Sequence, residues 1–376
     1  MPALPPARGL PLETPELPEA TQKLRREVRE FLANQEFEPR IDAWLSGWSP
    51  EFSHALGARG WLGMTWPRQY GGHERTAIER YVVLEELLAA GAPVAAHWIA
   101  DRQSGPLLLR YGSEAQRERF LPPITRGECY FAIGMSEPDS GSDLASVTTS
   151  AVRDGNGWRV RGRKVWTSGA HQAGFMISLV RTGPRQGDRH EGLTQLVIDL
   201  HAEGVEVRPI RLITGEHHFN EVILEDVHVP DELVVGNAGD GWKQVTAELA
   251  YERSGPERLL STYRLLAETC RLASDDRTHE AAGRLIARLW TLRLLSLGVA
   301  GRLGRGDEPA VEAALVKDLG TRFEREVTEV ARSIYPVPRP EPLEALLRMA
   351  IVHGPGFTLR GGTTEILRSV VARALK

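Results

Sequence analysis

The sequence has few of the features that mark secreted or membrane proteins. Only two cysteines occur among its 376 residues, Cys129 and Cys270, and neither has the spacing of a metal ligand. Two cysteines cannot build a disulfide framework, so we expect a protein of the reducing cytoplasm. No apolar run approaches the roughly 20 residues that cross a bilayer. The proline-containing N-terminus also lacks the apolar centre of a signal peptide, so we expect no membrane association.

A surplus of positive charge is missing as well. Lys and Arg number 46 against 50 Asp and Glu, which gives a formal net charge of −4. Basic residues do not gather into patches with interleaved aromatics, so we expect no nucleic-acid partner. The hydrophobic share of 41% is typical of globular proteins, and the chain length predicts two or three domains.

Helical patterns fill the first part of the chain. Residues 1–20 carry repeated prolines and predict a flexible arm. Leu24, Val28 and Phe31 then recur at helical spacing. A second helix is predicted over 76–90, and Ser113 is a candidate cap for a charged helix that begins near Ala115.

Strand patterns follow, and helical patterns then return. Residues 158–162 alternate directly after the turn Asp-Gly-Asn-Gly at 154–157, which predicts a hairpin. Further short apolar runs lie at 175–180 and 193–198. The order predicts an α+β fold with three domains. These are an N-terminal helical domain (1–128), a central antiparallel β-sandwich or barrel-like domain (129–237) and a C-terminal four-helix bundle (238–376).

Four segments resemble, in the same order, those of the acyl-CoA dehydrogenase family. They are GMSEPDSGSD (134–143), GRKVWTSGA (162–170), FNEVILEDVHVP (219–230) and GGTTEILR (361–368). These ordered matches give a resemblance that spans roughly residues 61 to 375. It implies an oxidoreductase that binds FAD and oxidises an acyl-CoA thioester at its α and β carbons.

The resemblance also implies roles for individual residues. In the family, a tryptophan at the position of Trp166 lies beside the flavin ring, and a hydroxyl at the position of Ser168 bonds flavin N5. Ser142 and Arg253 are expected to contact the substrate. The remaining expected FAD contacts are Met135, Ser136, Gly141, Ser142, Thr167, Thr363 and Glu365.

The position of the catalytic base is less regular. The reaction needs a carboxylate that removes the α-proton while hydride leaves the β carbon. Many members carry it two residues before the threonine of the C-terminal segment, where this chain has Gly361. Isovaleryl- and long-chain-type members carry it on the first helix after the sheet, and Glu252 matches that position. Glu257 and the absence of any base are the alternatives.

Two segments depart from the family's pattern. Residues 275–283 keep Arg277 but lack a Phe-Gly pair, and 333–340 replace a glycine loop that reaches the FAD of a neighbouring subunit. These departures resemble actinobacterial members that act on steroid side chains, some of which work as pairs of unlike subunits.

Three hypotheses therefore stay open. The first is an active dehydrogenase of lipid metabolism, a homodimer or homotetramer that passes electrons to an acceptor such as electron-transfer flavoprotein. The second is a catalytically silent subunit of a heteromer. The third is a flavin oxidase or monooxygenase with the same fold, against which the pair Glu252-Arg253 argues.

Overall fold

We describe the chain from a computed structural model, which covers residues 17–184 and 187–374 but not the side chains of 249–252 and 254. Its contacts divide it into two compact units. The sheet unit comprises Trp44–Arg75 and Pro93–Glu248, and the helical unit comprises the chain up to Ala43, Thr76–Ala92 and the chain from Leu249 onward. The three-domain division with boundaries near 128 and 237 stays a prediction.

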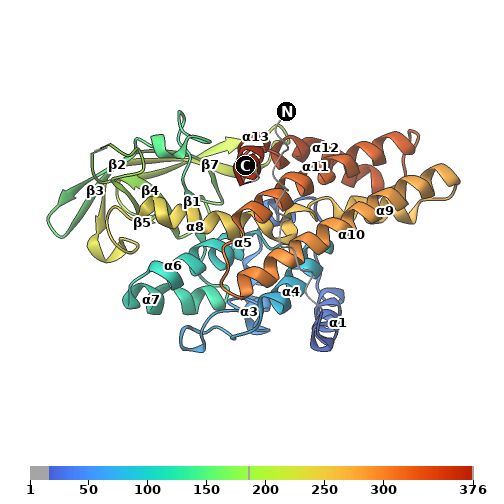
Figure 1. Ribbon diagram of the computed structural model, residues 1–376, viewed down its shortest axis with the longest axis horizontal. Coiled ribbons are helices and arrows are strands. Elements are labelled where there is room, and N and C mark those ends of the chain that lie inside the picture. The colour runs from blue at the N-terminus through green and yellow to red at the C-terminus, as the bar shows by residue number, and fades with distance from the viewer. Residues whose placement is uncertain (1–16, 185–186, 375–376) are drawn as a thin grey trace, which may run out of the picture. The chain divides into compact units, whose positions relative to one another are not determined.

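The helical unit is built around one long helix, α11, which contacts η5, α9, α10, α12 and α13. Figure 1 shows α10 and α11 side by side. The predicted C-terminal helical bundle is therefore confirmed. The elements of this unit are α1 (Glu19–Ala33), α4 (Ala77–Ala89), η5 (Pro256–Arg258), α9 (Tyr263–Arg271), α10 (Asp276–Gly304), α11 (Ala310–Ile334), α12 (Leu343–Phe357) and α13 (Thr364–Ala374).

The sheet unit contains seven strands and the helices that cover them. Its helices are α3 (Pro50–Ala58), η1 (Arg68–Tyr70), α5 (Ala95–Ile99), the π-helix η2 (Ala100–Ser104), α6 (Gly105–Tyr111), α7 (Glu114–Thr125), η3 (Leu144–Ser146) and η4 (Asp231–Leu233). Its strands are β1 (Phe131–Gly134), β2 (Ser150–Asp154), β3 (Gly157–Ser168), β4 (Phe175–Arg181), β5 (Leu193–Asp199), β6 (Val205–Arg211) and β7 (His217–Pro230). Two helices include the points where the chain passes between the units, α2 (Ala43–Ser46) and α8 (Gly241–Ser254).

Local sequence signals account for several of these boundaries. Thr76 and Ser113 each begin a capping box, which fixes the starts of α4 and α7 within one residue of the predictions. Asp154 pairs with Gly157 across a two-residue turn, so the predicted hairpin is confirmed. Along residues 17–184 and 187–374, none of the helices combines the length and apolar character that crossing a membrane requires.

The sheet is mixed, whereas the sequence predicted an antiparallel one. Strand order is β1-β4-β2-β3-β7-β6, with β5 also paired to β4. The pair β1–β4 is parallel, and Phe131 of β1 lies opposite Phe175 of β4. The whole β2–β3 hairpin intervenes between these two strands, so the connection is long enough to return the chain in the same direction. Phe120 of α7 packs edge-on against both rings.

A buried ion pair lies inside the sheet unit. Lys164 of β3 is fully buried, and its Nζ lies 2.8 Å from Oε1 of the buried Glu137. The same Nζ donates to the carbonyl oxygens of Met135 and Leu179, at 3.2 and 2.6 Å. Glu137 accepts further hydrogen bonds from the backbone N–H of Thr148 and of its neighbour, at 2.6 and 2.9 Å. One lysine therefore joins β3 to β4 and to the loop after β1.

The surroundings of this pair decide its protonation. Burial alone would raise the pKa of Glu137, but the Lys164 ammonium and the hydrogen-bond donors outweigh it and lower that pKa to about 2. Burial lowers the pKa of Lys164 to about 8, although the attraction of Glu137 opposes this change. Both partners therefore carry their charges near neutral pH.

We predict that Glu137 contributes to acid sensitivity. Because its pKa is lower in the folded chain, its contribution is complete above the ordinary value of 4.5 and is lost as pH falls toward 2. Between about pH 5 and about pH 3, the free energy of unfolding of the wild type should fall by roughly 1–2 kcal/mol more than that of Glu137→Gln, after allowance for solvent screening. Urea denaturation measures both, with exposed Glu232→Gln as control. Equal pH slopes for wild type and Glu137→Gln would contradict the prediction.

Candidate functional site

Trp166 interrupts the regular course of β3. Lys164 pairs with Val222 and Thr167 with Asn220, so β3 has one residue more than β7 at this point, which is a β-bulge. Trp166 has a φ of 59°, a conformation that is rare and costly for an aromatic residue. Its side chain is 56% exposed, although strand alternation from the buried Lys164 would turn it inward. The bulge therefore presents an indole ring on the surface of the unit.

Hydroxyl groups lie next to this ring along the strand. Ser168 is half-buried, and Thr167 is fully buried. The Oγ1 atom of Thr167 has no hydrogen-bond partner among the described residues. A buried hydroxyl without a partner is uncommon, because it loses its hydrogen bonds to water. The indole of Trp166 contacts Phe219 of β7 edge-on, with ring centroids 5.8 Å apart.

The first resembling segment lies against the same stretch of β3. The carbonyl of Ser136 accepts a hydrogen bond from the N–H of Val165, directly before Trp166. The structure thus brings Met135 and Ser136 against the stretch of β3 that carries Trp166, Thr167 and Ser168, and the roles of these residues in cofactor binding stay predictions. Gly141 and Ser142 lie exposed on the following turn.

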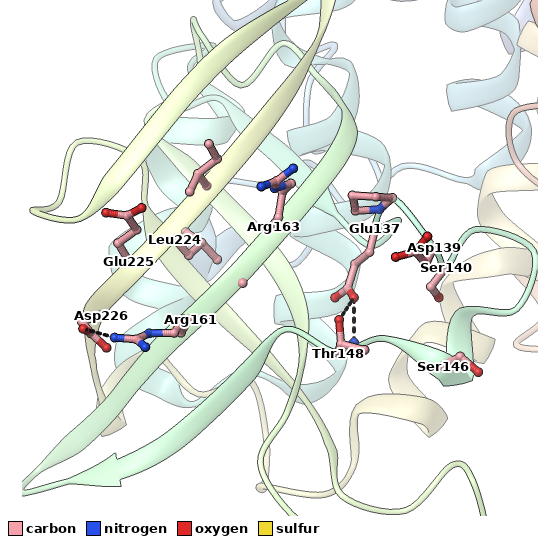
Figure 2. A pocket seen from close by; sticks show the side chains of 13 residues that line it. Glu137, Asp139, Ser140, Ser146, Thr148, Arg161, Arg163, Leu224, Glu225 and Asp226 are labelled. Atoms are coloured by element: carbon pink, nitrogen blue, oxygen red, sulfur yellow. Dashed lines mark hydrogen bonds and ion pairs between the residues drawn. The ribbon is translucent and has the colours of Figure 1, made fainter.

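A pocket of about 720 Å³ lies beside this segment. One wall is the loop from Glu137 to Thr148, and the other consists of Arg161, its neighbours on β3, and residues 223–226 of β7. Figure 2 shows the Glu137 carboxylate turned toward Thr148, and Arg161 paired with Asp226. The predicted cofactor residues do not line this pocket.

The helical unit holds the other half of the predicted residues. Arg253 at the end of α8 is 8% exposed, and its Nε donates to the carbonyl oxygen of Gly361 at 3.2 Å. Lys317 of α11 donates to the carbonyl oxygen of Gly362 at 2.7 Å. Both glycines have positive φ, 68° and 96°. A Cβ on Gly362 would lie 3.2 Å from Nη2 of Arg253, so this turn needs glycine for its conformation and for space.

An ion pair fixes the residue before this turn. Arg360 donates to both carboxylate oxygens of the buried Asp42, at 2.5 and 2.6 Å. Burial would raise the pKa of Asp42, but the charge of Arg360 and the hydrogen bonds hold it well below its usual range. Lys317, Thr321 and Glu324 recur at i, i+4 and i+7 on the buried side of α11. Sequence reasoning missed these anchors, and that polar stripe is the signal that would have found them.

The two candidate bases differ in what the structure shows. Glu252 lies on α8, but its side chain is outside the described residues, so its role stays a prediction. Glu257 lies on η5, is only 2% exposed, and has its carboxylate 3.7 Å from the Nε of Arg258.

The predicted cofactor contacts of the C-terminal segment lie at the start of α13. Thr363 precedes this helix, and its carbonyl accepts a hydrogen bond from the N–H of Leu367. Glu365 is exposed in the first turn of the helix.

The residues of the sheet unit fit the FAD that the resemblance implies. A flat aromatic cofactor needs a ring face to lie against and donors for its polar edge. Trp166 offers an outward ring, Ser168 offers a hydroxyl two residues on, and Thr167 has a hydroxyl that still lacks a partner. A strained backbone of this kind is typical of functional sites, which favours a binding role over a structural one.

Comparisons with known proteins identify the family of the chain. Residues 18–128 match the family model described as "Acyl-CoA dehydrogenase, N-terminal domain", and residues 132–227 match the model of the middle domain. Acyl-CoA dehydrogenase FadE29 of Mycobacterium tuberculosis is 32% identical over 93% of this chain and 95% of its own length. FadE34 of the same organism is 35% identical over 85% of this chain, which spans only 45% of the length of FadE34.

Solved structures give the same result. The chain is similar to the Tcur3481-Tcur3483 steroid ACAD, with a TM-score of 0.84, 30% identity, and coverage of 96% of this chain and 97% of that one. It is also similar to the ChsE4-ChsE5 complex from Mycobacterium tuberculosis, with a TM-score of 0.80, 30% identity, and coverage of 95% and 97%.

The turn at Gly361 and Gly362 gives a stability prediction. Gly362→Ala should lower the free energy of unfolding by about 1–3 kcal/mol, because φ is positive and the new Cβ crowds Arg253. Gly283→Ala, on an exposed and open position of α10, should instead raise it by about 0.5–1 kcal/mol. Urea denaturation of the two variants tests the opposite signs. The prediction fails if Gly362→Ala is as stable as Gly283→Ala.

Proposed function

Because the chain belongs to the acyl-CoA dehydrogenase family, we propose that this enzyme binds FAD and forms a double bond between the α and β carbons of an acyl-CoA thioester. The observation that carries the proposal is the β-bulge that presents Trp166 outward beside Ser168. The bulge strains the backbone at Trp166, and a ligand that binds against the exposed indole would explain why this strained conformation is present.

The reaction removes two hydrogens from the substrate, one as a proton from the α carbon and one as a hydride from the β carbon. FAD, when bound, supplies the acceptor for the hydride that leaves the β carbon. Glu252 takes the proton from the α carbon, and the electron pair of that bond forms the new double bond. Trp166 supports one side of the cofactor ring, and Ser168 donates a hydrogen bond to its edge. Thr363 and Glu365 contact the cofactor from the C-terminal segment, and Ser142 contacts the substrate.

Arg253 supports the assignment of Glu252. Many relatives carry the base in the C-terminal segment, but Gly361 has no side chain there. Its carbonyl oxygen instead accepts the hydrogen bond from Arg253, the residue next to Glu252 on α8. The end of α8 is therefore fixed within the helical unit, and a fixed backbone is what a base needs to meet its proton at a defined distance. Arg253 also lies where the family contacts the thioester.

The base is tested by Glu252→Gln. Glutamine keeps the size of the side chain but cannot accept the α-proton, so the variant should retain FAD while acyl-CoA no longer bleaches the flavin. Stopped-flow absorbance of the bound flavin measures the bleaching rate, which we expect to fall at least about 100-fold. Glu257→Gln tests the competitor, and Glu280→Gln on the surface of α10 is the control. The assignment would be overturned if acyl-CoA still bleached the flavin of Glu252→Gln fully. It would also be overturned if bleaching were lost in Glu257→Gln but not in Glu252→Gln.

Substrate and assembly follow from the relatives. We propose a bulky steroid-type acyl-CoA as substrate, since a steroid ACAD is among the similar structures. Electron-transfer flavoprotein is the proposed acceptor, and the cytoplasm the proposed location. We propose a homodimer or homotetramer. The second candidate is a silent subunit of a heteromer, which the ChsE4-ChsE5 complex favours.

Expression of the chain alone separates these two candidates. An active homomer should purify yellow and reduce an artificial dye when given a panel of acyl-CoA thioesters that includes steroid side chains. A colourless chain that turns over none of the panel would favour the silent subunit. Light scattering on the same sample gives the number of 41.6 kDa chains in the assembly.

A further inference from the structure

Asn220 of β7 lies behind the bulge that presents Trp166. Its side chain is fully buried, and its Nδ2 donates to the carbonyl oxygen of Thr167 at 3.0 Å. The same Nδ2 lies 3.1 Å from Nδ1 of His171, and Oδ1 lies 2.7 Å from Nε2 of His217. One amide therefore connects the residue after Trp166 to two histidines.

The carbonyl of Thr167 fixes the orientation of this amide. A carbonyl oxygen only accepts, so the atom facing it must be the NH₂ group of Asn220. The second N–H of that group then points at Nδ1 of His171, which must be unprotonated and accept. Oδ1 faces His217, so Nε2 of His217 must carry a proton and donate. Each donor and acceptor of the Asn220 amide has a partner.

The two histidine rings also support each other. They are stacked, with centroids 3.9 Å apart and an interplanar angle of 23°. Burial and the neighbouring His217 lower the pKa of His171 below its ordinary value of 6.5. His217 and His218 are the titratable groups that act on His171, and His218 in turn lies 3.1 Å from the carboxylate of Glu216. A proton on Nδ1 of His171 would turn its contact with Asn220 into two facing donors.

We propose that Asn220 is a positioning residue that, together with His171 and His217, holds the Trp166–Ser168 segment in the shape that receives the flavin. The proposal rests on the proposed function. Residue 166 occupies an unfavourable backbone conformation, and such a conformation persists only where its surroundings fix it. Asn220 donates its hydrogen bond to Thr167, the residue after Trp166. It does so from β7, the strand paired with β3, and within the interior of the sheet unit.

The support is sensitive to pH in one direction. When His171 is neutral, its Nδ1 accepts from Asn220 and the network is complete. Because the pKa is lower in the folded chain, this state is complete above 6.5 and is lost as pH falls through the lowered value. Flavin affinity of the wild type should therefore decrease on acidification, while His171→Gln, which does not titrate, should show a flatter profile.

The central test compares FAD binding by Asn220→Ala with that of the wild type. Loss of the amide should weaken FAD binding about tenfold or more and change the visible circular dichroism of the bound flavin. Asn220→Asp, which keeps the size but cannot donate to Thr167, should behave similarly. Asn237→Ala is the matched control, because Asn237 is exposed and its amide donates to the carboxylate of Asp240, away from the β-bulge. Far-ultraviolet circular dichroism shows whether each variant is folded.

Nitrogen NMR of the histidines tests the network without FAD. In the wild type, neutral His171 should be the tautomer that is protonated on Nε2. The substitution Asn220→Ala should shift the pKa of His171. Wild-type FAD affinity in folded Asn220→Ala would overturn this proposal and leave the proposed function standing. A wild-type chain that takes up no FAD would instead overturn the proposed function, and with it the flavin-positioning role. The opposite histidine tautomer would overturn the network itself.

Discussion

The buried pair of Lys164 and Glu137 is the interaction on which the Trp166 segment of the sheet unit depends. The two residues come from different resembling segments, and their bond fixes the loop after β1 against β3. Lys164 also binds carbonyl oxygens on both sides, so the ammonium is fully coordinated by acceptors rather than by water. Breaking a buried pair leaves one charge uncompensated, typically at a cost of about 3–5 kcal/mol. The strand therefore must turn residue 164 inward.

That requirement explains the bulge. In a regular strand, residue 166 would point the same way as Lys164 and would be buried. One extra residue in β3 reverses this direction, so that Lys164 stays inside and Trp166 faces out. The resemblance identified Trp166 from the sequence, but period-two alternation predicts the opposite direction for its ring. The exposure of the indole follows from an interstrand register, which local sequence does not determine.

Other features of the fold also separate into those that local sequence determines and those that depend on contacts between distant residues. The helix start near Thr76, the cap at Ser113 and the turn before Gly157 depend on contacts within four residues, and these three features were predicted. The parallel pairing of β1 with β4 joins residues more than forty positions apart, and alternation within each strand does not reveal it. The Gly361 position was predicted as the loss of a base. Its carbonyl, however, is an acceptor for Arg253, a role that residue type alone does not indicate.

At the bulge, the free-energy cost of the strained backbone is comparable to the free energy that the hydrogen bonds of Asn220 contribute. A residue held at an unfavourable φ costs about 1–3 kcal/mol, and each hydrogen bond of Asn220 contributes about 0.5–1.5 kcal/mol net. The bond to Thr167 is therefore of the same order as the strain, and the two bonds to His171 and His217 fix the amide that donates it. The apolar core of the sheet unit, which includes Val160 and Val227, is built from other side chains. Damage to the support should consequently change the geometry of the Trp166 segment before it unfolds the sheet, because the hydrogen bonds of Asn220 and the apolar contacts of the core are different interactions.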